Sequence, residues 1–516
     1  MGRAARWLWA AILLTPCCAM AAPVAASAPS IRHYDLRVQP DFAARMVRLH
    51  VGIAIQNPGL LDRFNFELNP RYDPASVRAD GREAQWERSG AAITVVAPKP
   101  ANPTHLEFDL QATPGNSRDE DRPVIDDNSL FLLWSDRFYP VDFAQWATVT
   151  TTVVLPKPFL AIAPGKLVGT VPAGDSVEYR FETSHPLVAF SVFADDRWIR
   201  TRRDVRGFHM ETLLYPESQK YAEQIFSTSA DVLEFFSRLH GGYSFDQFSF
   251  VTIEGMYARR AFPGFVGYSP AYLEKEMTGT GYDAHETSLL WWGYTARGSG
   301  PGSGQWTEGF GDYVEVMYAE ARHKPLAAIF QHFREQYLAS PDEQDVAFTA
   351  LRGNTPQKFV HGKYPWLMHV MRLAVGDDAF NNGIRLLFQR YRFHGFTIDE
   401  FVGAFEEASG TSLRWWREQW LERKGVPTLS FSSELEPEGR GYRVTCHLEQ
   451  QGKARRIPLE IVIRTDSGQQ VHRVMFDQER APVVLHTTEK PVAVQLDPED
   501  KLLVHRSGPK DALTSR

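Results

Sequence analysis

The residues best suited to chemistry in this chain are an adjacent histidine and glutamate, His285 and Glu286. Zinc hydrolases commonly carry two histidines four residues apart, because positions i and i+4 share one face of a helix. The glutamate after the first histidine then acts as general base toward a metal-bound water. In one large group of such enzymes, a glutamate 19 residues beyond the second histidine completes the metal shell. Here the second histidine position holds Leu289, and Glu308 follows it by 19 residues. We therefore predict His285 and Glu308 as metal ligands and Glu286 as a catalytic residue, in a zinc site that lacks one ligand.

The sequence around this dipeptide resembles the M1 family of zinc aminopeptidases, the gluzincins. Their signature reads HExxH, then an aromatic residue and glycine, then a W-x-N-E-G-like segment that carries the third ligand. Trp292-Gly293 and Glu308-Gly309-Phe310 stand where that pattern places them, and Trp306 is one residue nearer the glutamate than usual. Further stretches that resemble the family extend over most of the chain, at residues 241–245, 360–380 and 415–427.

The resemblance also implies an oxyanion-stabilising tyrosine, whose place is taken here by His361. An imidazole can donate a hydrogen bond, so His361 could still polarise a carbonyl and is our second predicted catalytic residue. If its ring points toward the metal, it could instead replace the ligand that is missing at Leu289. The remaining alternative is that His361 has drifted and has no role.

The family's exopeptidase segment, a G-x-M-E-N-like stretch, holds the free amine of the substrate with its glutamate. The corresponding residues here, 257–264, contain no acid and include Arg259 and Arg260. A cationic amine would be repelled at such a site, whereas an anionic group would be attracted. The departure argues against an ordinary aminopeptidase, unless both arginines are simply solvated surface charges.

The surrounding pattern predicts a multidomain α+β protein that positions these residues on helices. Residues 22–205 alternate apolar and polar side chains with short turns, which predicts an antiparallel β domain, the saddle domain of the family. Residues 206–424 are mainly helical and match a thermolysin-like domain; Thr397 and Glu400 form a capping box within them. Alternation returns over residues 425–516, which we predict to be a β-sandwich.

Composition and the first residues bear on location. Residues 1–21 combine Arg3 and Arg6, a short apolar run and an Ala-Met-Ala exit, the pattern of a cleavable signal peptide. We expect an exported protein, periplasmic or secreted, without a stable membrane span. The net charge of −7 is spread along the chain and does not favour nucleic acid as a partner. Once residues 1–21 are removed, Cys446 is the single cysteine, so no internal disulfide can form.

Three functions remain open from the sequence. The first is a pseudo-peptidase that binds a peptide or protein segment in the groove between domains. The second is a working zinc metallopeptidase with a rearranged set of ligands, His285, Glu308 and His361. The third is hydrolysis of a non-peptide amide or ester with the same residues. Ordinary structural roles compete with all three: His285 and Glu286 as packed core residues, and Glu308 as an acid that stabilises a helix N-terminus.

Overall fold

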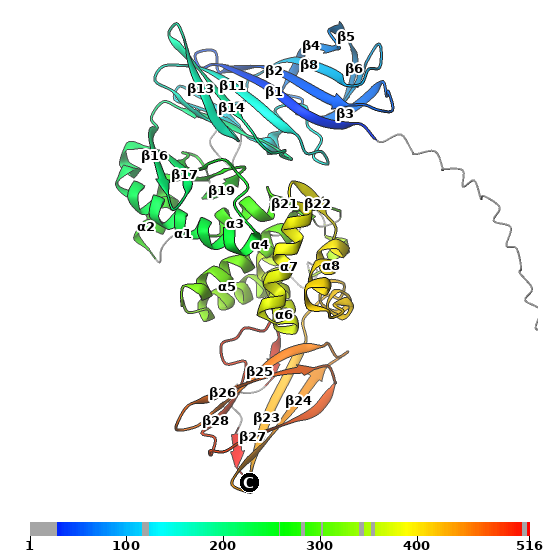
Figure 1. Cartoon of the computed structure of the whole chain (residues 1–516), viewed down its shortest axis with the longest axis vertical. Helices are drawn as coiled ribbons and strands as arrows, with labels where there is room; N and C mark the ends of the chain where they lie inside the picture. Colours follow the sequence, from blue (N-terminus) through cyan, green and yellow to red (C-terminus); the bar gives the residue numbers. More distant parts are fainter. Residues whose placement is uncertain are drawn as a thin grey trace, which may run out of the picture.

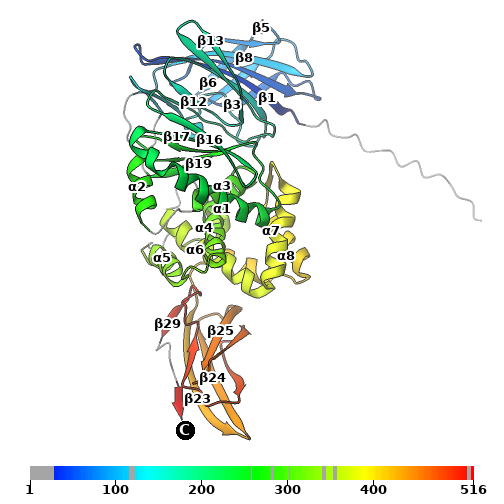
Figure 2. The same cartoon turned by 60° about the vertical axis from the view of Figure 1, so that its left-hand side comes forward.

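The computed structural model describes residues 28–115, 123–256, 258–279, 284–300, 303–339, 345–351, 357–507 and 513–515. The predicted signal peptide, residues 1–21, lies outside them, as does Tyr257 of the segment with the two arginines. The described chain is elongated, with a sheet-rich N-terminal region at one end, helices in the middle and a further group of strands at the other end (Figure 1, Figure 2).

The N-terminal region is built on an eight-stranded sheet in the order β13-β14-β11-β1-β2-β8-β4-β5. Its pairings are antiparallel except for β1 with β11. Its strands are β1 (Ser30–Asp41), β2 (Met46–Gln56), β4 (Asp73–Ala79), β5 (Arg82–Glu83), β8 (Thr104–Ala112), β11 (Thr148–Pro156), β13 (Lys166–Ala173) and β14 (Ser176–Glu182). In β2 every second residue from Val47 to Ile55 is buried, so the alternation seen in the sequence marks the core face.

Two smaller sheets complete this region. One has the order β3-β7-β6 and the other β12-β15-β10-β9. Their strands are β3 (Arg63–Glu67), β6 (Gln85–Ser89), β7 (Ala92–Val96), β9 (Val124–Ile125), β10 (Ser129–Leu132), β12 (Leu160–Ile162) and β15 (Val192–Asp195). The sheets enclose an apolar core to which Leu36, Val51 and Phe108 belong.

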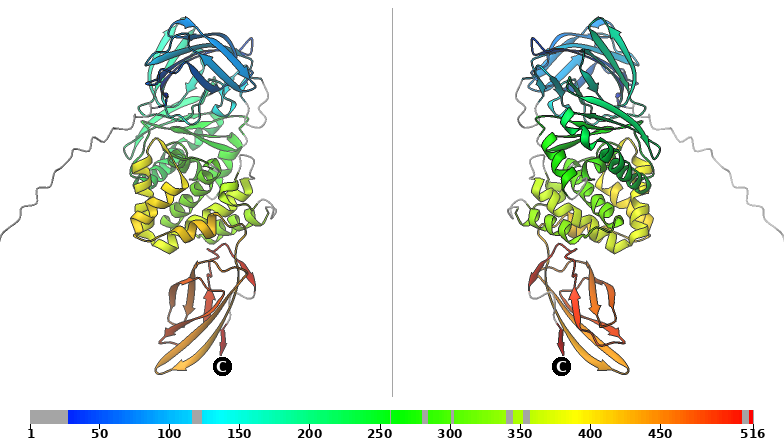
Figure 3. Two further views of the ribbon diagram at one scale, coloured as in Figure 1. Left: turned by 90° about the vertical axis from the view of Figure 1, so that its right-hand side faces the viewer. Right: turned by 90° about the vertical axis from the view of Figure 1, so that its left-hand side faces the viewer.

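The middle of the chain begins with a five-stranded sheet, β16-β17-β18-β20-β19, which is followed by the helices. Its strands are β16 (Ile199–Val205), β17 (Phe208–Leu214), β18 (Phe248–Thr252), β19 (Arg259–Phe262) and β20 (Phe265–Tyr268). β16 pairs with β17, so this hairpin spans the predicted domain boundary between residues 205 and 206. Figure 3 shows the helices between the two sheet-rich ends.

The helices follow local signals in the sequence. They are α1 (Ala222–His240), α2 (Pro270–Thr278), α3 (His285–Trp292), α4 (Ser303–Ala321), α5 (Ala327–Leu338), α6 (Gln357–Val375), α7 (Asp377–Tyr391), α8 (Ile398–Ser409) and α9 (Arg414–Trp416). The predicted capping box opens α8, with the Thr397 hydroxyl accepting from the Glu400 N–H and the Glu400 carboxylate bonding back to the Thr397 N–H. Gly241 ends α1 in the left-handed conformation that favours glycine. A short parallel pair, β21 (Ala296–Gly298) and β22 (His394–Phe396), ties α3 to the end of α7.

The C-terminal strands form two sheets. One has the order β27-β24-β23-β29, with β30 also on β23, and the other is β26-β25-β28. The strands are β23 (Thr428–Glu438), β24 (Gly441–Gln451), β25 (Ile457–Arg464), β26 (Gln469–Phe476), β27 (Arg480–Thr487), β28 (Ala493–Leu496), β29 (His505–Ser507) and β30 (Leu513–Ser515). Cys446 is fully buried in β24, and burial raises the pKa of its thiol to about 12, as expected of a core residue. Within the described ranges, no helix has both the length and the apolar character needed to span a bilayer.

Candidate functional site

Three helices position the predicted site residues. His285 is the first residue of α3, Glu308 lies on α4 and His361 on α6, and α4 packs against both neighbours. Two glycines of α4 permit this close packing. A Cβ atom at Gly311 would lie 2.9 Å from Leu289 Cδ2, and one at Gly309 would collide with a side chain of α6. The close approach of α3 and α4 brings the acids of α4 to the imidazole of His285.

A pocket of about 590 Å³ collects all four predicted metal and catalytic residues, His285, Glu286, Glu308 and His361. The rest of its lining is partly basic and partly aromatic. These other residues are Trp134, Val188, Ala189, Ala258, Arg259, Arg260, Ala261, Leu289, Gly293, Tyr294, Arg297 and Thr307. The pocket therefore draws on the N-terminal region, on the end of the five-stranded sheet and on the helices.

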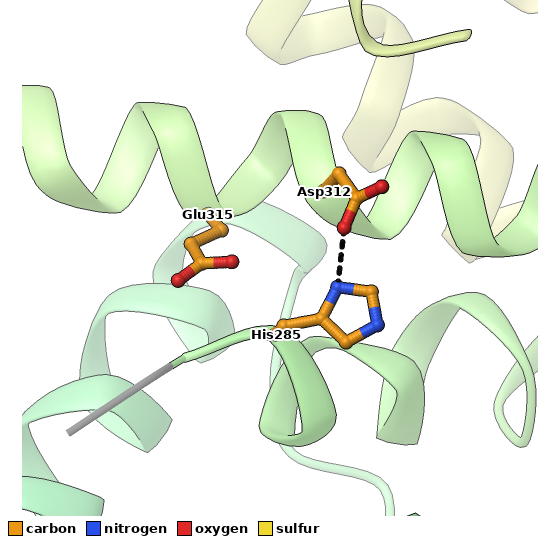
Figure 4. A group of neighbouring side chains, drawn as sticks. All are labelled: His285, Asp312 and Glu315. Atoms are coloured by element: carbon orange, nitrogen blue, oxygen red, sulfur yellow. Dashed lines mark ion pairs between the residues drawn. The ribbon is translucent and has the colours of Figure 1, made fainter. Parts of the chain in front are cut away.

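Asp312 is the buried centre of the site, and the sequence analysis did not identify it. Its two carboxylate oxygens lie 2.6 Å from His285 Nδ1 and 2.6 Å from His361 Nδ1 (Figure 4 shows the pair with His285). Burial alone would raise the pKa of Asp312, but the two imidazoles outweigh it and hold this pKa well below its usual value. One carboxylate thus pairs with both rings.

The same network sets the charge of His285. Burial alone would lower the pKa of this imidazole, but Asp312, with help from Glu308 and Glu286, raises it well above its usual value. The His361 pKa is also raised, again because Asp312 outweighs the effect of burial. At neutral pH we therefore expect a cationic His285 that is buried against an anionic Asp312. The structure assigns His285 an electrostatic role and not merely a packed position in the core.

Glu308 lies on the opposite side of the His285 ring from Asp312. Its carboxylate is 3.4 Å from His285 Nε2, and its side chain is 36% exposed toward the pocket. It is the sixth residue of α4. Stabilisation by the helix dipole falls off within the first turn, so Glu308 does not lie where an acid stabilises a helix N-terminus.

Glu286, the predicted general base, already has a cationic partner. Arg259 Nε lies 3.3 Å from Glu286 Oε1, and the Arg259 side chain is mostly buried. Its guanidinium also lies 5.1 Å from the centre of the Tyr272 ring and donates to the Tyr272 hydroxyl. The expectation that Arg259 is an ordinary solvated charge is therefore wrong. Arg259 is the first residue of β19, and this strand packs against α3.

The residues present do not fit the three-ligand zinc shell of the family. Leu289 is only 8% exposed and forms part of the pocket wall where a histidine would be needed. Ligand atoms of His285, Asp312 and Glu315 do lie within 4.8 Å of one another, so these residues form a candidate His/Asp/Glu group for a metal (Figure 4). However, two ligands of one tetrahedral zinc ion lie about 3.3 Å apart, whereas 2.6 Å between Nδ1 and a carboxylate oxygen is a hydrogen-bond distance. A zinc ion could use His285 Nε2 and Glu308, with Asp312 only orienting the ring.

Comparisons with known proteins agree on the fold. No family model matches the chain. It is 32% identical to aminopeptidase N of Streptomyces lividans over 80 residues and 29% identical to that of Escherichia coli K12 over 86 residues. These segments are 16% and 17% of this chain and span only 9% and 10% of those relatives.

Solved structures with the same fold cover far more of the chain. An M1 zinc metallopeptidase from Deinococcus radiodurans bound to Tyr-Ser-Ala has a TM-score of 0.65 at 17% identity and covers 78% of this chain and 95% of its own. Aminopeptidase A of Legionella pneumophila in complex with aspartic acid has a TM-score of 0.73 at 15% identity, over 93% of this chain and 60% of that one. The fold is M1 aminopeptidase-like, and the predicted resemblance is confirmed at that level.

Proposed function

We propose that this protein binds a peptide or protein segment in the pocket and is not an ordinary aminopeptidase. The observation that carries the proposal is Leu289, whose apolar side chain closes the pocket wall at the position of the second metal-binding histidine. A peptide is the ligand class we propose because a structural neighbour with this fold was solved with a tripeptide substrate.

The charges of the pocket support the proposal that the protein is not an ordinary aminopeptidase. An aminopeptidase needs a free carboxylate to hold the substrate amine. Among the described lining residues the two acids are Glu286 and Glu308, and each already has a cationic partner, Arg259 and His285 respectively. A substrate amine would have to displace one of these partners, which leaves a charge unpaired and is unfavourable in a partly buried site.

A zinc hydrolase with rearranged ligands is the second candidate. It is favoured by the 3.4 Å approach of Glu308 to His285 Nε2 and by the carboxylate on the opposite ring nitrogen, which is how ligating histidines are commonly oriented. Zinc, when bound, would supply Lewis-acid activation of water. The Nδ1 atom of His361 is paired with Asp312, as is that of His285. The role of His361 as a replacement ligand stays a prediction.

Elemental analysis of the purified protein separates the two candidates. We expect well under one equivalent of zinc, unchanged in a Glu308→Ala variant, together with no release of amino acids from aminoacyl anilides. An equimolar zinc content that is lost in Glu308→Ala would instead favour the hydrolase. His361→Ala then tests the surrogate ligand, because a zinc content that this change leaves intact excludes His361 from the metal shell.

We also propose that the protein is exported, on the basis of the signal-like pattern of residues 1–21. N-terminal sequencing of the protein from a secreting host should give a first residue near Ala22. A chain that keeps residues 1–21 and stays with the cytoplasmic fraction would contradict this.

A further inference from the structure

The pocket wall contains a third arginine, Arg297, besides Arg259 and Arg260. Arg297 lies in the middle of β21 and lines the pocket. Within the part of the chain that the structure describes, neither an ion pair nor a hydrogen bond engages its guanidinium. Arg259, by contrast, is held by Glu286 and Tyr272. Partly buried arginines are normally paired, so a lone one on a pocket wall points to a ligand.

Arg297 is held on a firm support. β21 pairs with β22 in parallel, and Arg297 is opposite Gly395 in that register. The neighbouring residue Ala296 is fully buried in the core. The guanidinium is therefore presented from a strand whose backbone is paired with β22. Such a fixed planar fork suits bidentate recognition of a carboxylate.

The surroundings of Arg297 are basic. The charges of Arg260, Glu308 and Arg297 all act on the Tyr294 phenol, so these side chains gather around one ring in the pocket. Burial lowers the pKa of Arg297, because its charged form has lost water without gaining an anion. Glu308 does not supply that anion, since it is engaged with His285. An incoming carboxylate would supply it.

We propose that the pocket recognises a carboxylate of the bound peptide through Arg297, with Tyr294 and Arg260 beside it. The inference rests on the proposed peptide-binding function and specifies its ligand class as peptides that present an acidic group. Two sources share this chemistry, an aspartate or glutamate side chain and a free C-terminal carboxylate. A cationic amine is disfavoured at the same place.

The test uses the full chain and four probes in calorimetric titrations at low salt. The probes are acetyl-Ala-Asp-Ala-amide, its Asn analogue, acetyl-Ala-Ala-Ala with a free C-terminus, and succinate. We expect the Asp peptide or the free-C-terminus peptide to bind about 10–100-fold more tightly than the Asn amide, as a charge-assisted bidentate bond implies. Whichever of the two binds more tightly identifies the source of the carboxylate.

Arg297→Gln should remove this preference, and Arg297→Lys should restore only part of it because an ammonium lacks the planar fork. Arg48→Gln is a matched control, since Arg48 likewise has neither an ion pair nor a side-chain hydrogen bond among the described residues but lies exposed on β2. This control should leave binding unchanged. Thermal unfolding without ligand checks folding, and Arg297→Gln should be at least as stable as the natural chain because it removes an unpaired charge.

The outcomes separate the two proposals. Equal binding of the Asp and Asn peptides that is unaffected by Arg297→Gln overturns the role of Arg297 and leaves peptide binding standing. If succinate is the only probe that binds and Arg297→Gln abolishes its binding, the carboxylate site is supported and the proposed peptide binding is overturned. No binding of any probe overturns both.

Discussion

Asp312→Asn tests whether one carboxylate holds the site together. The change keeps the shape of the side chain and removes its charge. In the natural chain Asp312 contacts the Nδ1 atoms of His285 and His361 at 2.6 Å each, and all three helices α3, α4 and α6 meet there. The Asp312 side chain is only 10% exposed, so solvent screens these pairs little.

The expected cost follows from burial. Removing one partner of a buried ion pair commonly costs about 3–5 kcal/mol. The amide of asparagine can still make one hydrogen bond to an imidazole, which is worth about 1 kcal/mol. The two rings can also lose their protons, which relieves the unpaired charge. We therefore expect a loss of about 3 kcal/mol near pH 6, a large fraction of the 5–15 kcal/mol typical of a domain.

The cost should depend on pH in a definite direction. The raised pKa of His285 means that its pairing is fully present below its unfolded pKa of 6.5 and fades as pH rises through the folded pKa. The lowered pKa of Asp312 means that its pairing is present above 3.8 and fades as pH falls further. The penalty of Asp312→Asn should thus be largest between these two values and smaller in alkaline buffer.

Urea unfolding followed by tryptophan fluorescence, in buffer with a chelator, gives the overall cost. Hydrogen exchange of peptides from α3, α4 and α6 gives the local cost, which matters because a multidomain chain need not unfold in one step. The control is Asp204→Asn, which removes an exposed His–Asp pair with His209 and should cost about 1 kcal/mol or less. Equal losses in the two variants, or a penalty that grows toward alkaline pH, would refute the reasoning.

Three further changes test other parts of the structure. Leu289→His restores the missing i+4 ligand, so elemental analysis should show equimolar zinc, and zinc at 100 times its Kd should stabilise this variant by about 2.7 kcal/mol; unchanged zinc content would mean that Leu289 is not the ligand position. Lys363→Met leaves Asp345 without the cation of a buried pair with a 2.5 Å contact and should cost about 3–5 kcal/mol in urea. Lys220→Met, in an exposed pair, is the control and should change stability far less. Burial lowers the pKa of His240 to about 3, so the stability that neutral His240 contributes is present above pH 6.5 and is lost as pH falls. His240→Asn should therefore weaken the fall in stability between about pH 7 and pH 5 in urea unfolding. An equal fall in both proteins would contradict this.

Local signals predicted much of the fold. The capping box at Thr397 and the alternation of β2 are short-range features whose physical causes lie within a few residues, and both are present. The apolar spacing of residues 414–423 predicts a single α-helix, whereas only Arg414–Trp416 is α-helical and Arg417–Leu421 forms a π turn. The indole N–H groups of Trp416 and Trp420 donate to the backbone carbonyls of Leu367 and Arg456 respectively. Such tertiary contacts are not encoded in local propensity, so the sequence could not predict the turn.

The sequence predicted which residues line the site but not which of them contact one another. The motif located His285, Glu286, Glu308 and His361, and the pocket contains all four. It gave no indication of Asp312, although that residue lies four positions after Glu308 and therefore on the same face of α4. Which of several acids meets an imidazole depends on helix packing and on rotamers, and neither can be obtained from spacing alone.

The arrangement of charges shows how a site with Leu289 at a ligand position can balance its acids without a metal ion. A lapsed metal site would leave Glu286, Glu308 and a buried carboxylate without the cation that balanced them, at a cost of several kcal/mol. In this chain each acid has instead a cationic side chain: Arg259 for Glu286, and His285 for both Glu308 and Asp312. A divalent ion would have to displace a proton from His285, whose pKa is raised by that same network, before it could bind. A proton and a metal ion therefore compete for His285 Nε2, and within the described pocket lining Arg297 is a cation that neither an ion pair nor a hydrogen bond engages.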